Sequence, residues 1–174
     1  MTALPLQQAI DHPRLVPALI VAVSLGALAV ALASQYWGDL QPCVLCIYQR
    51  YAYLGAAAFG LFGLIAGPRT GARRAAVALA GLAFLTGAAI AAFHVGVEQQ
   101  WWRGTDACHA PAFDPNASIA DLRKQLLGTE FVPCDEVPWS LFGVSMAGYN
   151  VLASLGLALA SFWAARNIGR TQRP

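Results

Sequence analysis

The chain has 174 residues, of which 57% are hydrophobic and only 11% are charged, and its formal net charge is +2. A soluble domain of this length carries roughly a quarter charged residues, so the composition excludes an ordinary water-soluble protein. The sequence contains no basic patch suited to nucleic acid.

Four long apolar runs predict four transmembrane helices, because roughly 20 apolar residues cross a bilayer as a helix. We expect the spans at residues 15–36, 46–66, 75–97 and 140–165. Two loops, residues 37–45 and 98–139, lie on one side of the membrane. The expected fold is an all-α four-transmembrane-helix bundle that forms a single membrane domain over residues 1–174.

The tripeptide Ala-Leu-Ala at residues 31–33 resembles a signal-peptidase site at the end of the first apolar run. This run is longer than the core of a usual signal peptide, and the preceding stretch carries Asp11 as well as Arg14. We therefore expect the first helix to be retained as a transmembrane span.

Basic residues are unequally divided between the two sides of the predicted bundle. Seven flank the spans on the side of the termini: Arg14, Arg69, Arg73, Arg74, Arg166, Arg170 and Arg173. The two opposite loops hold only Arg103, Arg123 and Lys124. By the positive-inside rule, both termini face the cytoplasm and the two loops face outward.

The second outer loop contains a short predicted helix. Asn116 or Ser118 can cap its start and Gly128 can end it. Its apolar residues fall on one face, namely Ile119, Leu122, Leu126 and Leu127. This pattern predicts an interfacial helix lying on the membrane surface.

All four cysteines fall in the outer loops or at the outer interface. Cys43 and Cys46 form a CxxC motif at the mouth of the second span, whereas Cys108 and Cys134 lie in the long loop. An even number of cysteines on an oxidising side indicates disulfides. Three pairings are possible, although CxxC cysteines usually pair with each other, and such motifs are mostly redox-active or metal-binding.

Two ionisable residues accompany the CxxC motif within the predicted spans. Arg50 follows Cys46 by four positions and lies on the same helical face, and His94 lies near the outer end of the third span. Arg50 could be a snorkelling anchor, and His94 could hydrogen-bond a neighbour or water. An ionisable residue within a span is nevertheless a functional hypothesis by default.

Two kinds of cofactor site, a zinc site and a c-type haem site, are alternatives to a redox role for the cysteines. A four-cysteine zinc site normally has two tight pairs, whereas Cys108 and Cys134 are 26 positions apart. A c-type haem requires CxxCH, and Ile47 follows Cys46. We therefore expect no metal site and no haem.

The chain combines the block PCVLCIYQR, His94, two further cysteines in the second outer loop and the block CDEVPWSLFGVSMAGYN. This combination resembles the DsbB family of bacterial inner-membrane disulfide-forming enzymes. This resemblance covers almost the whole chain. It implies a quinone-dependent oxidoreductase of the bacterial inner membrane, with ubiquinone or menaquinone as the cofactor and a periplasmic, DsbA-like thioredoxin-fold oxidase as the partner.

The resemblance also implies roles for individual residues. The expected disulfides are Cys43–Cys46 and Cys108–Cys134. The partner would attack the second disulfide at Cys108, and Cys134 would then exchange with Cys43, which leaves Cys46 as a thiolate beside the quinone. Arg50 and His94 would line the quinone site, with Met146 as a weaker candidate.

Two alternative functions remain open from the sequence. The first is a thiol relay like that of the vitamin K epoxide reductases, in which the quinone is reduced for its own sake. The second is a non-catalytic membrane scaffold with two structural disulfides. Thiol-driven quinone reduction distinguishes the scaffold from both enzymes.

Overall fold

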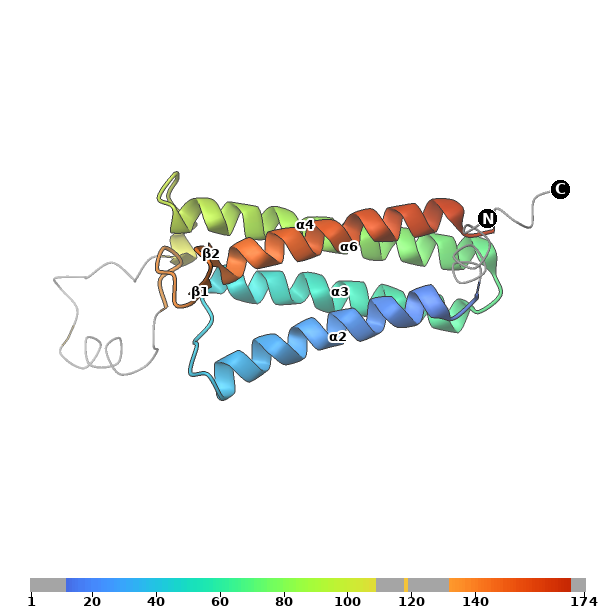
Figure 1. Ribbon diagram of the computed structural model, residues 1–174, viewed down its shortest axis with the longest axis horizontal. Coiled ribbons are helices and arrows are strands. Elements are labelled where there is room, and N and C mark those ends of the chain that lie inside the picture. The colour runs from blue at the N-terminus through green and yellow to red at the C-terminus, as the bar shows by residue number, and fades with distance from the viewer. Residues whose placement is uncertain (1–11, 109–117, 119–131, 170–174) are drawn as a thin grey trace.

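The computed structural model describes residues 12–108, 118 and 132–169 of the chain. Within these residues the protein is mostly helical, with four long helices that lie side by side in an elongated bundle (Figure 1). They are α2 (Leu15–Tyr36), α3 (Val44–Ala66), α4 (Thr70–Glu98) and α6 (Met146–Asn167). A 3-10 turn, η1 (Asp106–Cys108), and the strands β1 (Ser140–Leu141) and β2 (Val144–Ser145) complete the described elements.

Three of the four helices, α2, α4 and α6, are long and apolar enough to cross a membrane. Such a set of helices indicates a multi-pass membrane protein. The fourth, α3, has 23 residues but carries Gln49 and Arg50 in its first two turns, which lowers its hydropathy. The prediction of spanning helices is therefore confirmed for three of the four.

Small residues allow the helices to pack closely. Helix α3 packs against both α2 and α4, and α4 packs against α6. A Cβ atom at Gly60 of α3 would come within 2.9 Å of the Val21 side chain, and one at Gly81 of α4 within 3.1 Å of the Phe162 ring. Close approach at small residues is the usual basis of helix packing within membranes.

The two ends of the bundle differ in the segments that they carry. The start of α2, the turn between α3 and α4, and the end of α6 lie at one end (Figure 1). Arg14, Arg69 and Arg166 belong to this end. The opposite end carries the start of α3, η1 and the β-hairpin, so all four cysteines lie there.

The last helix begins later than the predicted fourth span, which started at residue 140. Residues 140–145 form an antiparallel hairpin, in which Ser140 pairs with Ser145. Its two turn residues, Phe142 and Gly143, both have positive φ angles, as a tight hairpin turn requires. The Ser145 side chain then caps α6 by accepting a hydrogen bond from the Gly148 N–H.

The predicted interfacial helix of the second loop, residues 116–128, falls almost entirely outside the described residues. Only Ser118 of that segment is described, and it is exposed. The helix therefore stays a prediction.

Candidate functional site

The CxxC motif forms the start of α3. Cys43 is the N-cap residue, and its sulfur accepts a hydrogen bond from the backbone N–H of Cys46 at 3.4 Å. The Cys43 and Cys46 sulfurs lie 3.2 Å apart as free thiols. The structure has no bond between these two sulfurs, and the Cys43–Cys46 disulfide expected from the sequence stays a prediction.

Cys108 and Cys134 form a disulfide in the structure, with Cα atoms 5.2 Å apart. Both are buried, and both pack in one cluster with Cys43, Leu45 and Val97. Helix η1, which contains Cys108, contacts α3. The two cysteine pairs, far apart in the sequence, therefore lie next to each other in the fold.

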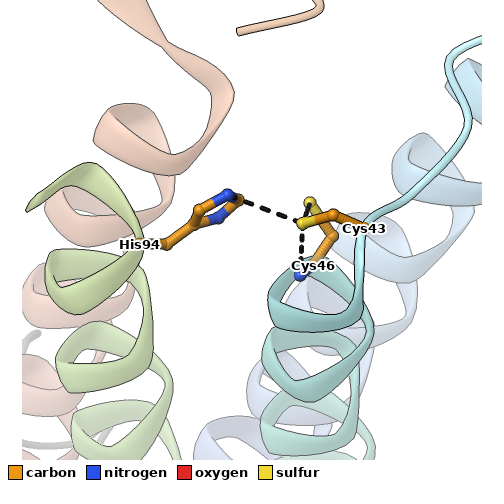
Figure 2. A group of neighbouring side chains, drawn as sticks. All are labelled: Cys43, Cys46 and His94. Carbon is orange, nitrogen blue, oxygen red and sulfur yellow. Dashed lines mark hydrogen bonds between the residues drawn. The ribbon is translucent and has the colours of Figure 1, made fainter. Parts of the chain in front are cut away.

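His94 of α4 joins the two pairs. It points from α4 toward the sulfurs at the start of α3 (Figure 2). Its Nε2 atom lies 3.5 Å from the Cys43 sulfur and 3.2 Å from the Cys134 carbonyl oxygen. The Glu98 carboxylate, one turn along α4, lies 4.0 Å from the same nitrogen. His94 is buried, so these contacts form away from bulk water.

A chain of buried polar side chains holds the other ring nitrogen of His94. Its Nδ1 atom lies 3.1 Å from the Gln49 amide nitrogen, and the Gln49 amide oxygen accepts a hydrogen bond from Asn150 of α6. The Asn150 oxygen in turn accepts hydrogen bonds from Tyr53 at 2.7 Å and Ser154 at 3.0 Å. Because buried polar groups are costly to leave unpaired, this chain fixes the orientation of the imidazole.

Arg50 faces α2. Its guanidinium donates hydrogen bonds to the Gln35 side-chain oxygen at 2.6 Å and to the Ala31 carbonyl oxygen at 3.1 Å. The sequence predicted that this charge lies on the same helical face as the CxxC cysteines. The spacing of residues along the helix could not predict the hydrogen bonds to α2. These contacts anchor a cation at the end of the bundle that carries the cysteines.

A cavity of about 380 Å³ lies beside the CxxC motif. Its wall is mostly apolar and is formed by α2, α3, α6 and the segments that connect the helices, and Cys46, Arg50 and His94 are among its polar lining residues. Met146, at the start of α6, also lines it and is 37% exposed. An apolar cavity with a few convergent polar groups is typical of a small-molecule site.

Cys43 is the acidic thiol of the site. Its hydrogen bond with the Cys46 side chain lowers the pKa of Cys43 from 9.0 to about 4, and His94 adds to this effect, although burial opposes it. Thiol–disulfide exchange proceeds through thiolates, both as attacking and as leaving groups. Cys43 is therefore suited to exchange with a neighbouring disulfide near neutral pH.

The sequence analysis did not single out Gln49, Asn150 or Tyr53. Gln49 stands next to Arg50 within the second span, and Asn150 ends the SMAGYN block of the fourth. Polar side chains inside a span commonly hydrogen-bond across helices, so their polarity within an apolar run was the signal that could have identified these residues. Their partners depend on how α3, α4 and α6 pack together.

Comparisons with known proteins agree with the thiol chemistry of this site. The sequence model of the family described as disulfide bond formation protein DsbB matches residues 13–164. A disulfide bond formation protein B from Xanthomonas axonopodis pv. citri is 33% identical over 150 residues, covering 84% of this chain and 86% of the relative. One from Stutzerimonas stutzeri is 30% identical over 156 residues, covering 83% and 91%.

A third relative of the same name, from Marinobacter nauticus, is 32% identical over 153 residues, which cover 83% of this chain and 87% of the relative. The matches thus extend over most of both sequences and include all four cysteines in the family match. The chain belongs to the DsbB family of disulfide bond formation proteins, and it is a membrane-spanning oxidoreductase.

Proposed function

We propose that this protein re-oxidises a periplasmic, DsbA-like thioredoxin-fold oxidase and passes the electrons to a membrane quinone. The observation that carries the proposal is the position of His94, whose Nε2 contacts both Cys43 and Cys134. His94 contacts the Cys43 sulfur and the Cys134 carbonyl oxygen, and the two cysteine pairs pack in one cluster beside an apolar cavity, which would let electrons pass from the loop disulfide to α3 by thiol–disulfide exchange.

In this proposal α3 also spans the membrane, which gives a four-span bundle that forms one domain in the bacterial inner membrane. The polar residues of α3 support this, because Gln49 and Arg50 hydrogen-bond to neighbouring helices. The arginine-bearing end of the bundle, with both termini, faces the cytoplasm by the positive-inside rule. The cysteines then face the periplasm.

The first step of the proposed relay takes place at the loop disulfide. A thiolate of the reduced partner attacks the Cys108 sulfur, a mixed disulfide forms, and Cys134 leaves as a thiolate. Cys134 then attacks the Cys43 sulfur of an oxidised Cys43–Cys46 pair, and Cys46 leaves as a thiolate. The second thiolate of the partner then attacks the partner's own sulfur in the mixed disulfide, so that the partner leaves oxidised and Cys108 is freed as a thiolate. Cys108 attacks Cys134, which re-forms the loop disulfide and frees Cys43. Each exchange breaks one S–S bond and forms one, and the net result is two electrons on the Cys43–Cys46 dithiol of α3.

The residues around the cavity fit a quinone headgroup. Its apolar wall suits a lipid-soluble ring, and Arg50 and His94 provide hydrogen-bond donors next to Cys46. When bound, ubiquinone or menaquinone supplies the acceptor for the two electrons. Arg50 would hold a positive charge near the acceptor oxygen, His94 would hold a proton close to the sulfurs, and Met146 would border the ring.

The test is a coupled assay with the purified protein, a reduced thioredoxin-fold oxidase and a quinone. We expect the quinone absorbance to fall while the partner becomes oxidised, with two thiols lost for each quinone. The matched control is the Cys43→Ser, Cys46→Ser double variant, in which the absorbance should stay constant. No change with the unsubstituted protein, across several partners and quinones, would favour a scaffold with structural disulfides.

A further inference from the structure

Three atoms that bind transition metals converge at the start of α3. The Cys43 and Cys46 sulfurs lie 3.2 Å apart, and His94 Nε2 lies 3.5 Å from the Cys43 sulfur (Figure 2). All three atoms lie within 4.8 Å of one another. In a tetrahedral zinc site, with Zn–S and Zn–N bonds of about 2.3 and 2.0–2.1 Å, ligand atoms are roughly 3.4–3.9 Å apart. Small side-chain rotations bring the three atoms to this spacing.

We propose that the reduced Cys43–Cys46 pair and His94 form a binding site for a thiophilic divalent metal ion such as Zn²⁺. The ion would displace the protons that remain on the two sulfurs, and the resulting thiolates would balance its charge. Three protein ligands leave the fourth position open toward the cavity that Cys46 and His94 line. The proposal does not depend on the identity of the electron acceptor, because it uses only the reduced thiols and the imidazole.

The second ring nitrogen of His94 is held by an amide, although in the structure this amide donates its hydrogen bond to Nδ1. Metal-ligating imidazoles are usually held at their second nitrogen by a hydrogen bond, which fixes the ring. Here the Gln49 amide lies 3.1 Å from Nδ1, and Gln49 is itself held by Asn150. With a metal on Nε2, Nδ1 carries the proton. If both amides are rotated by half a turn, the Gln49 amide oxygen accepts a hydrogen bond from Nδ1–H, the Gln49 amide nitrogen donates to the Asn150 oxygen, and the Asn150 amide nitrogen donates to the Tyr53 and Ser154 hydroxyls.

Metal binding and disulfide formation exclude each other at this site. An S–S bond between Cys43 and Cys46 removes both thiolate ligands, so only the reduced pair can bind the ion. Conversely, a bound ion occupies both sulfurs and prevents their oxidation. The two sulfurs that carry electrons in the proposed relay would thus be held in their reduced state by a metal ion that also binds His94.

The experiment uses the full chain in lipid nanodiscs with Cys108→Ser and Cys134→Ser, so that only the α3 pair remains. The chain is reduced with a phosphine and titrated with Co²⁺, whose visible absorption reports tetrahedral thiolate coordination. We expect saturation at one Co²⁺ for each reduced chain, displacement by Zn²⁺, and no such absorption after the pair is oxidised. Zn²⁺ should also block re-oxidation of the pair until a chelator is added.

Two histidine variants separate the proposed site from chelation by the dithiol alone. His94→Ala should weaken Co²⁺ binding at least tenfold, whereas His12→Ala, which removes a histidine before α2, should leave it unchanged. Equal affinity in the His94→Ala variant would overturn the proposal.

X-ray absorption of the Zn²⁺-loaded Cys108→Ser, Cys134→Ser chain decides the matter even if the His94 variant fails to fold. Two sulfur neighbours at about 2.3 Å and at least one nitrogen at about 2.0–2.1 Å are the expected result. A first shell without a histidine nitrogen, or with fewer than two sulfurs, would contradict the proposed site.

Discussion

The two cysteine pairs, which have similar roles in the proposed relay, are held by different parts of the fold. Cys43 and Cys46 lie within one helical turn, where a backbone N–H and the His94 ring contact the Cys43 sulfur. Cys108 and Cys134 are 26 positions apart and are joined by a disulfide that ties two loop segments together. The helix start gives the first pair fixed spacing and an acidic thiol, whereas the second pair depends on the loops for its position.

The two pairs also differ in what can reach them. Cys46 lines the cavity, whereas Cys108 and Cys134 are only 2% and 0% exposed. Exchange requires an accessible sulfur, so attack on Cys108 by a folded partner requires the covering residues to move. In the proposed relay, this difference would let Cys43 and Cys46 exchange with small molecules at the cavity, whereas Cys108 and Cys134 would exchange with a protein partner.

Replacing Cys43 and Cys46, the pair at the start of α3, should have the largest effect on turnover. In the Cys43→Ser, Cys46→Ser variant, the loop disulfide should oxidise about one equivalent of reduced partner and then stop, because nothing re-oxidises the loop. The measurement is partner thiol content over time at a large excess of partner. Continuous turnover in this variant would show that the loop pair has another electron acceptor.

Replacing Cys108 and Cys134, the pair in the long loop, should impair oxidation of the protein partner more than oxidation of a small dithiol. The Cys108→Ser, Cys134→Ser variant should still reduce quinone with dithiothreitol, since a small dithiol can approach Cys46 through the cavity. It should use the protein partner poorly, because a thioredoxin fold is too bulky for the mouth of α3. Quinone loss and partner oxidation are followed separately, and rapid quinone-linked oxidation of the protein partner would rule out an ordered relay.

A substitution at Arg50 should affect only the cavity beside Cys43 and Cys46 and should leave the loop disulfide unaffected. Arg50→Ala should raise the apparent KM for quinone by roughly tenfold or more, because hydrogen bonds to charged groups contribute about 1.5–3 kcal/mol. Exchange at Cys108 should be unaffected, since Arg50 is bonded to α2. Arg103→Ala, in the outer loop, is the control. An unchanged KM would make Arg50 an anchor between helices.

The acidity of Cys43 should be measurable without turnover. Because its pKa is lowered from 9.0 to about 4, Cys43 should be a thiolate throughout the range above pH 5 and should be protonated only as the pH falls through 4. Alkylation of the reduced protein by iodoacetamide, followed at Cys43 by mass spectrometry, gives the midpoint. A midpoint near 9 would mean that the hydrogen bond with the Cys46 side chain and the contact with His94 do not lower the pKa of this sulfur.

Much of the helical fold could be predicted because hydropathy depends on local composition. The first predicted span coincides with α2, and α3 and α4 overlap the predicted ranges closely. The start of α6 was predicted six residues early, since the apolar run continues through the hairpin. Only the positive φ angles of Phe142 and Gly143 reveal the turn.

Four residues of the site could be found from the sequence, but Gln49, Tyr53, Asn150 and the contacts within the site could not. The cysteine spacing and the ionisable residues within apolar runs identified Cys43, Cys46, Arg50 and His94. That His94 contacts Cys43 and Cys134 at once follows from the packing of α4 on α3 and from the path of the loop. Hydropathy and spacing carry no information about such long-range contacts.

The most direct test of the relay is whether its two pairs can join. The Cys46→Ser, Cys108→Ser variant keeps only Cys43 and Cys134, which lie in one buried cluster and share contact with His94. After mild oxidation, non-reducing peptide mass spectrometry should find a Cys43–Cys134 disulfide in most molecules. The Cys43→Ser, Cys108→Ser variant should form far less of a Cys46–Cys134 bond. Free thiols at both Cys43 and Cys134 in the folded first variant would contradict electron transfer between the pairs.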